Sequence, residues 1–186
     1  MDFAAQFEQG LTYDQFLQSH GTADQQARWK SVFDQVHLTA AQTDLLSSFK
    51  RDMKVLCVAG AWCGDCVNQC PIFAHFAAAT SRIQLRFFDR DVHSALAQEL
   101  AVCGAPRVPA LLFLSEDNFP CGRYGDRTLS KYRQVATELE GAACSTGIIA
   151  PGSSLLDTVV QDWLNEFERI QLILRTSGRL RKLHGD

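Results

Sequence analysis

Apolar side chains recur at helical spacing over the first 53 residues, which predicts a helical segment throughout this stretch. A threonine is followed three residues later by a glutamine at three places, the pattern of a capping box at a helix start. Thr12, Thr22 and Thr39 therefore mark three predicted helix starts. Because their apolar stripes have to be covered, we expect these helices to pack on the rest of the protein as an N-terminal extension. Part of the same surface could instead hold a partner or cover a functional site.

The pattern changes after residue 53 to short apolar runs that alternate with helical stretches. The apolar runs predict three strands and a weaker fourth, and helical spacing follows Cys63 and recurs twice later. The predicted strands are 55–59, 83–88, 110–114 and 120–124, and the later helices are 94–102 and 128–140. This order predicts an α/β fold, with a central mixed β-sheet flanked by helices on both faces.

Residues 141–154 are rich in Gly, Ala, Ser and Pro, which predicts a loop. A broad apolar stripe then predicts a last helix from Leu155, docked on the main body or on a partner. The basic tail 175–186 is expected to be frayed and solvated. We therefore divide the chain into 1–53, 54–140 and 141–186, and expect the three parts to pack as a single compact unit.

Composition narrows the classes of partner and compartment. The 186 residues carry a formal charge of −3, which leaves no basic footprint for nucleic acid. The chain starts without a basic region followed by an apolar one, and no apolar run reaches 18 residues, so we expect no membrane association. Seven cysteines are scattered along the chain. This usage favours free thiols in a reducing, cytoplasmic setting over a secreted disulfide framework.

The chemistry concentrates where the first strand gives way to a helix. Gly60 ends the strand, and Cys63 and Cys66 follow with two residues between them. A cysteine at a helix N-terminus is favoured as a thiolate by the free backbone N–H groups and the helix dipole. Cys66 lies about one turn later on the same face, within reach of a disulfide. A strand, a C-x-x-C pair and a helix are typical of a dithiol redox site.

Three motifs then carry a resemblance to a known family. The stretch 62–66, Trp-Cys-Gly-Asp-Cys, resembles the Trp-Cys-Gly-Pro-Cys of thioredoxins, with Asp65 in place of proline. Pro71 stands eight residues after Cys63, where thioredoxins carry a helix-kinking proline, and Val108-Pro109 resembles their hydrophobic residue and cis-proline. The resemblance covers about residues 54–140. It implies a thioredoxin-like fold and reduction of protein disulfides without a bound cofactor.

The resemblance also implies roles for the two cysteines. Cys63 would attack a substrate disulfide and Cys66 would resolve the mixed disulfide. Asp65 changes this picture, because a carboxylate between the cysteines disfavours a thiolate on Cys63 and so predicts a reducing rather than an oxidising protein. The same carboxylate could instead help to deprotonate Cys66.

A second departure concerns proton transfer. Thioredoxins carry a buried Asp six residues before the attacking cysteine and a Lys on the next strand, and here these positions hold Cys57 and Phe87. Resolution is therefore expected to be slow, or to depend on Asp65 or water. The alternative function is a redox-sensing or partner-binding module without efficient turnover.

The family's substrate groove maps onto a small set of residues. A cis Pro109 would present the Val108 backbone beside Cys63 for pairing with a substrate strand. The residues expected to bind substrate are Trp62, Gly64, Val108, Pro109 and Tyr124. The predicted partner is a disulfide-containing protein or peptide. A flavin reductase, glutathione and another protein all remain open as the electron donor.

The cysteines and histidines also allow other kinds of chemistry. A metal-binding module is the third function class. Structural zinc sites use four ligands, commonly with a second paired motif, and this sequence has no second C-x-x-C or H-x3-H. A makeshift zinc site would have to include Cys70 and His75. We predict no metal. A Cys-His hydrolase is disfavoured because no motif places a partner for His75 or His93. The remaining cysteines are interpreted as structural: Cys57, Cys70, Cys103, Cys121 and Cys144.

Overall fold

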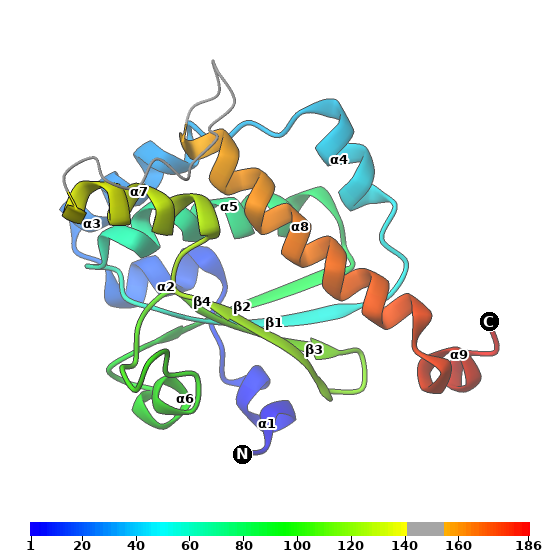
Figure 1. Ribbon diagram of the computed structural model, residues 1–186. Helices are drawn as coiled ribbons and strands as arrows, with labels where there is room; N and C mark the ends of the chain where they lie inside the picture. Colours follow the sequence, from blue (N-terminus) through cyan, green and yellow to red (C-terminus); the bar gives the residue numbers. More distant parts are fainter. Residues whose placement is uncertain (141–154) are drawn as a thin grey trace.

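The computed structural model describes residues 1–140 and 155–186, and its centre is a mixed sheet of four strands in the order β2-β1-β3-β4 (Figure 1). The two inner strands and the two edge strands agree with the predicted strands to within two residues. The strands are β1 Met53–Ala59, β2 Ile83–Asp89, β3 Ala110–Ser115 and β4 Pro120–Gly125. β1 runs parallel to β2 and antiparallel to β3, and β3 runs antiparallel to β4. The predicted mixed α/β sheet is confirmed.

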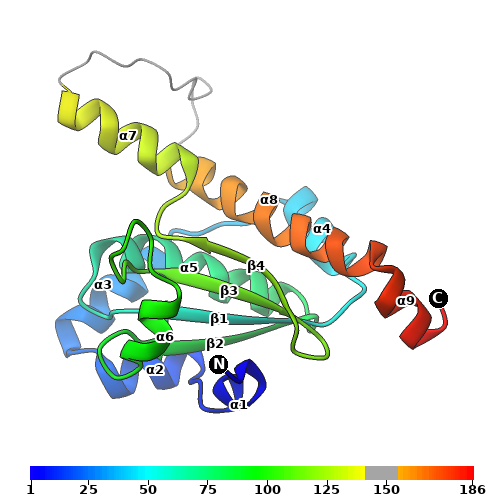
Figure 2. The same ribbon diagram turned by 60° about the horizontal axis from the view of Figure 1, so that its bottom comes forward.

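Helices cover both faces of this sheet. Helix α5 (Gly64–Ala79) and the long helix α8 (Leu155–Thr176) lie on one face, while α1 (Phe3–Glu8) and α6 (Ser94–Glu99) lie on the other (Figures 1 and 2). Helix α7 (Leu129–Glu140) follows β4 and contacts α8. Within the described ranges, no helix is both long and apolar enough to cross a membrane.

The N-terminal helices begin at the predicted threonines. Thr12, Thr22 and Thr39 form complete capping boxes at the starts of α2 (Tyr13–His20), α3 (Ala23–Phe33) and α4 (Ala40–Ser47). The segment is not helical throughout, because residues 34–39 and 48–52 connect helices and strands. Trp29 of α3 is fully buried, and its indole N–H donates to the Ala61 carbonyl at 2.9 Å. This bond anchors the N-terminal helices to the loop that precedes Cys63.

The last helix docks on the main body, one of the two possibilities that its apolar stripe left open. Its inward face buries eight residues: Val159, Val160, Trp163, Leu164, Phe167, Ile170, Gln171 and Leu174. Gln171 accepts hydrogen bonds from the backbone N–H groups of Lys50 and Arg51, at 3.0 and 2.7 Å, and donates to the Arg51 carbonyl. Helix α8 is therefore fixed to the chain that enters β1. The predicted loop 141–154 lies outside the described residues.

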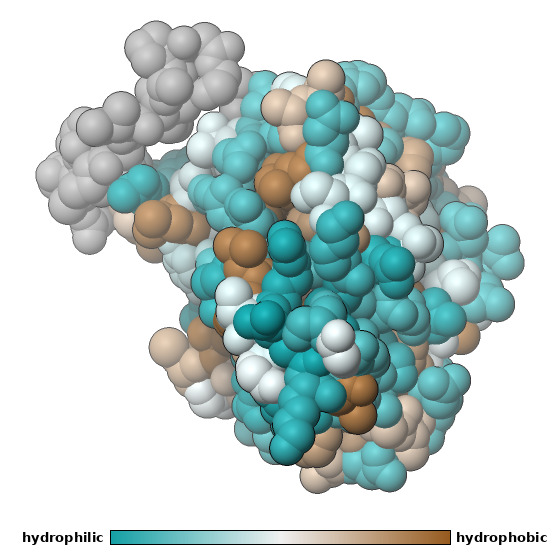
Figure 3. All heavy atoms as spheres, turned by 90° about the vertical axis from the view of Figure 1, so that its right-hand side faces the viewer, coloured by the Kyte–Doolittle hydropathy of each residue, from teal (hydrophilic) through white to brown (hydrophobic). Residues whose placement is uncertain are grey.

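The prediction of a frayed basic tail is wrong. Residues Gly178–His184 form a further helix, α9, capped by the Ser177 hydroxyl. Arg179 pairs with Asp117 in the β3–β4 turn, and His184 lies 2.6 Å from Glu116. The side of the molecule with α9 is mostly polar (Figure 3). Arg179 and His184 are thus held by acidic residues far away in the sequence, while most side chains of residues 175–186 are exposed to solvent, as expected.

Candidate active site

The loop from β1 to α5 brings Cys63 to the start of the helix, as predicted. A Cβ atom at Gly60 would stand 2.7 Å from the Trp62 ring, so a larger residue in this loop would displace the Trp62 side chain. Cys63 occupies the N-cap position of α5 and is half-buried, whereas Cys66 lies inside the first turns and is fully buried. Of the two sulfur atoms, only that of Cys63 can meet a large substrate.

The Val108–Pro109 segment lies against the Cys63 sulfur. Its peptide bond is cis, and the Cys63 thiol donates to the Val108 carbonyl at 3.5 Å. Gly125 allows this loop to approach β4, because a Cβ atom there would stand 2.7 Å from the Pro109 carbonyl oxygen. The fold therefore places the backbone of the buried Val108 next to a thiol that lies 45 residues earlier in the chain.

The two site cysteines affect each other's acidity. Burial opposes charge on Cys66, but the neighbouring Cys63 and Cys70 thiols and the Gly60 N–H, which donates to the Cys66 sulfur at 3.5 Å, outweigh burial and lower the pKa of Cys66. The neighbouring Cys66 sulfur, together with burial, raises the pKa of Cys63. The two thiols therefore titrate as a coupled pair, in which a proton passed from Cys63 to Cys66 moves the thiolate to the accessible sulfur.

Asp65 is paired in a way that the sequence analysis did not foresee. Its carboxylate accepts from the Arg127 guanidinium at 2.7 and 2.9 Å, and both side chains are mostly buried. The Arg127 guanidinium compensates the negative charge that was expected to act on Cys63. The Asp65 carboxylate acts on Cys66 instead, where it opposes the overall lowering of the pKa and is the smallest of several contributions. The expected repulsion at Cys63 is thus largely offset by a cation that no local motif announces.

We expect substitution of this ion pair to shift the acidity of the site. Arg127→Met leaves the Asp65 charge uncompensated, so it should raise the first thiol pKa of the cysteine pair, by up to about one unit. Asp65→Asn should lower it, since the source of the repulsion is gone. The pH dependence of Cys63 alkylation by iodoacetamide measures the effect: the profile should move to higher pH in Arg127→Met and to lower pH in Asp65→Asn.

The double variant of Arg127 and Asp65 is the control for this shift. It removes both charges, so its profile should lie close to that of the unmodified protein. If the alkylation profiles of both single variants equal that of the unmodified protein, the ion pair does not act on the thiols.

Gln69 connects the active-site helix to two distant segments. Its side chain is buried, donates to the Asp126 carbonyl at 3.0 Å and accepts from the Trp163 indole N–H at 2.9 Å. Asp126 in turn pairs with Arg107 and Tyr132. The turn after β4 and helix α8 are both fixed to α5 through this one amide. Sequence reasoning missed Gln69, Arg127 and Asp126, because each has a partner that lies far away in the sequence: Asp126, Asp65 and Arg107, respectively.

The other residues predicted to bind substrate differ in how far they are open to solvent. Trp62 is 48% exposed, and the Arg90 guanidinium lies over its ring at 4.4 Å. A Cβ at Gly64 would meet no atom within 4 Å, so the surface beside Cys63 is open. Tyr124 packs its ring against Trp163, with the ring centroids 4.8 Å apart. The Tyr124 ring is thus engaged with α8, and its part in a substrate groove stays a prediction.

A metal centre finds no candidate ligands in the described part of the chain, where no group of three or more His, Cys, Asp or Glu side chains is placed to hold an ion. His75 stacks on Phe33, and its Nε2 lies 2.9 Å from the Phe33 carbonyl oxygen. This contact turns the imidazole toward α3. The makeshift zinc site that would use His75 with the cysteines is therefore not assembled.

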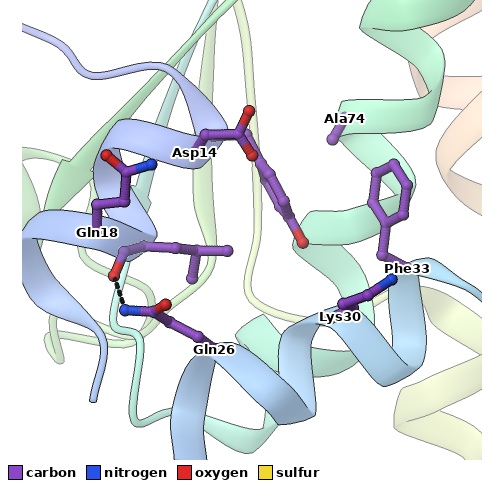
Figure 4. A pocket seen from close by; sticks show the side chains of 8 residues that line it. Asp14, Gln18, Gln26, Lys30, Phe33 and Ala74 are labelled. Carbon is purple, nitrogen blue, oxygen red and sulfur yellow. Dashed lines mark hydrogen bonds between the residues drawn. The ribbon is translucent and has the colours of Figure 1, made fainter. Parts of the chain in front are cut away.

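A separate cavity opens among the N-terminal helices. It encloses about 530 Å³ between α2, α3 and α5, and Gln26 there donates to the Leu17 carbonyl at 3.1 Å (Figure 4). Its lining residues are Tyr13, Asp14, Leu17, Gln18, Gln26, Lys30, Phe33 and Ala74. The site cysteines are not among them, so this cavity is distinct from the surface at Cys63.

Comparison with known proteins adds a family and a fold. The family model described as thioredoxin matches residues 10–139. A protein of unknown function from Pseudomonas aeruginosa has a similar structure, with a TM-score of 0.70 at 19% identity over 91% of this chain and 96% of that one. An HIV epitope scaffold gives a TM-score of 0.69 at 21% identity, covering 91% and 99% of the two chains.

A third structure, the oxidised mitochondrial thioredoxin 3 of Saccharomyces cerevisiae, covers 50% of this chain and 86% of its own, at 20% identity and a TM-score of 0.35. No curated protein matches the chain. The family match begins in the N-terminal helices, well before the part of the chain that carries the motifs, and ends in α7.

Proposed function

Because the chain belongs to the thioredoxin family, we propose that it is a thiol-disulfide oxidoreductase that reduces protein disulfides through Cys63 and Cys66. One observation carries this proposal. A half-buried thiol at a helix N-cap precedes a buried thiol by about one turn, and a cis-proline loop lies against it. These are an accessible nucleophile, a resolving thiol and a backbone edge for substrate.

The reaction proceeds in two exchanges. A proton shift from Cys63 to Cys66 leaves the thiolate on the accessible sulfur, which attacks one sulfur of the substrate disulfide. The substrate S–S bond breaks, its second sulfur leaves as a thiolate, and Cys63 is joined to the substrate. Cys66 then loses its proton and attacks the Cys63 sulfur, which releases the other substrate thiol. The substrate gains two electrons from the two thiols and two protons, one from the cysteine pair and one from water, and the protein keeps a Cys63–Cys66 disulfide.

The surroundings of Cys63 support a reducing direction. A strong oxidant of this kind needs a strongly stabilised thiolate in its reduced form. The groups beside the Cys63 sulfur are the Val108 carbonyl and the Cys66 thiol, and neither carries a positive charge that would stabilise a thiolate. The Arg127 guanidinium is already paired with Asp65. The described cysteines are free thiols, which suits the reducing cytoplasm that we propose as the compartment.

An extended peptide with a disulfide fits the surface beside Cys63. The Val108 backbone lies next to the attacking sulfur, and the open surface at Gly64 leaves room for a chain to pass. Trp62 offers an exposed aromatic face at the edge of this surface. Main-chain pairing would give affinity for many sequences, since it does not depend on side-chain identity. The physiological electron donor is a separate protein or thiol that reduces the Cys63–Cys66 disulfide.

A redox titration of the Cys63 and Cys66 pair tests the proposal. After equilibration in dithiothreitol buffers, acid quenching and alkylation, the mass of the peptide should report a reversible two-electron couple near the thioredoxin value of roughly −270 mV. Absence of a disulfide between the two cysteines would overturn the proposal. A disulfide that forms without multiple turnover of a substrate would favour the alternative, a redox-sensing or partner-binding module.

A further inference from the structure

Two further cysteines lie directly behind the active-site pair. Cys70 follows Cys66 by one helical turn on the same face of α5, and Cys57 comes from the central strand β1 beneath it. Both are fully buried. The Cys57 and Cys70 sulfur atoms are 3.9 Å apart, and Cys66 and Cys70 are neighbours on one face of the helix. The four cysteines thus lead from the surface at Cys63 to the core at Cys57.

This series exceeds what packing alone requires. A single buried cysteine is a small apolar side chain that needs no sulfur partner. Here Cys57 takes the place where thioredoxins hold a buried carboxyl group, and within the apolar core its sulfur lies 3.9 Å from a second sulfur. A disulfide bond requires a sulfur–sulfur separation of about 2.05 Å, so the two sulfur atoms must approach each other by about 2 Å. Rotation of the Cys57 and Cys70 side chains contributes directly to this approach.

We propose that Cys57 and Cys70 form a second dithiol, which takes up oxidation from the Cys63–Cys66 disulfide and so stores two further reducing equivalents inside the protein. The inference rests on the proposed function of the Cys63 and Cys66 pair, which must first be oxidised by a substrate disulfide. It extends that function, because one fully reduced chain can then reduce two substrate disulfides before it needs an electron donor.

The transfer consists of two internal exchanges. The Cys70 thiolate attacks the Cys66 sulfur of the Cys63–Cys66 disulfide, which forms a Cys66–Cys70 bond and releases the Cys63 thiolate. The Cys57 thiolate then attacks the Cys70 sulfur, which forms the Cys57–Cys70 disulfide and releases the Cys66 thiolate. The two protons lost by Cys57 and Cys70 end on Cys63 and Cys66. No outside oxidant is consumed, and the active-site dithiol is regenerated.

Burial decides the route and the speed of this transfer. Neither Cys57 nor Cys70 meets solvent, so a protein disulfide reaches them only through Cys66. Burial also raises the pKa of both thiols, which keeps the fraction of attacking thiolate small. We therefore expect the internal exchange to be slower than reduction of the first substrate disulfide.

Counting thiols during oxidation tests the inference. The full-length chain with Cys103, Cys121 and Cys144 changed to serine retains only the four cysteines of the series. It is fully reduced, treated with excess oxidised glutathione, quenched in acid at successive times and alkylated for intact mass and peptide mapping. Alkylation should fall from four groups to two, with Cys63 and Cys66 linked, and then to none, with Cys57 and Cys70 linked as well.

Two variants in the same background define the route. Cys70→Ala should stop at a single Cys63–Cys66 disulfide, which halves the number of electrons released. Cys66→Ser should leave Cys57 and Cys70 fully alkylated, because the internal path is cut. A Cys57–Cys70 disulfide that forms equally fast in Cys66→Ser would overturn the route through Cys66.

The failures of the two proposals are distinguishable. If the four-cysteine protein stops at two alkylated thiols with Cys63 and Cys66 linked, the second dithiol is overturned and the oxidoreductase stands. If all four thiols remain alkylated after glutathione treatment, the proposed function fails and the further inference fails with it.

Discussion

The Cys66→Ser variant is expected to accumulate as a covalent mixed disulfide between Cys63 and its substrate. Cys63 carries the accessible sulfur at the N-cap of α5, so the first exchange still takes place. Serine is not acidic enough to form the attacking anion at neutral pH, so the second exchange is lost. Turnover of a disulfide-containing protein should fall to the uncatalysed rate. Intact mass under non-reducing conditions should show the protein with one substrate molecule attached.

Two controls give this result its meaning. Cys63→Ser should lose turnover just as fully but trap no substrate, because the buried Cys66 sulfur is out of reach. Cys103→Ser changes an exposed cysteine outside the site and should keep full turnover. Trapping by Cys63→Ser and not by Cys66→Ser would reverse the assigned order of attack. Equal trapping by both would mean that neither sulfur is dedicated to resolution.

Trp163→Ala should be among the most destabilising single substitutions in the chain. The indole is fully buried in α8, packs against Phe73 of α5 with ring centroids 4.6 Å apart and donates to Gln69. Truncation of a buried Trp leaves a cavity and costs about 3–5 kcal/mol, and the Gln69 oxygen also loses its donor. Thermal unfolding followed by circular dichroism should show a Tm lower by roughly 10 °C.

Graded variants separate packing from hydrogen bonding at this position. Trp163→Phe keeps a ring against Phe73 but cannot donate to Gln69, so it should cost about 1–3 kcal/mol. Trp62→Ala removes the exposed tryptophan and should change Tm little, since most of that side chain is already in contact with water. A Tm for Trp163→Ala equal to that of the unmodified protein would show that α8 does not hold the active-site helix.

Local signals in the sequence predict much of this fold. The capping boxes at Thr12, Thr22 and Thr39 need only residues three apart, and the structure contains each of them. The position of Cys63 at a helix start likewise follows from an apolar run, a glycine and the helical spacing that comes after them. Such features are decided within one or two turns of chain, where residue type and spacing carry the physical cause.

The features that sequence reasoning missed depend on partners far along the chain. Arg127 reaches Asp65 across 62 residues, and Trp163 reaches Gln69 across 94. Neither pair has a period or a motif, because the fold alone brings the residues together. The basic tail was misjudged for the same reason: Arg179 is held by Asp117, which lies 62 residues before it. An isolated charge run gives no sign of whether an opposite charge will be placed beside it.

The bond from Trp163 to Gln69 also has a consequence for biosynthesis. A ribosome releases the chain from its N-terminus, so the sheet and helix α5 emerge before α8 has been made. Until α8 leaves the exit tunnel, the Gln69 amide lacks its indole donor and the apolar face of α5 that α8 covers is open to water. Cys63 and Cys66 are therefore made before the helix that supports α5, and the candidate site reaches its final form only at a late stage of translation.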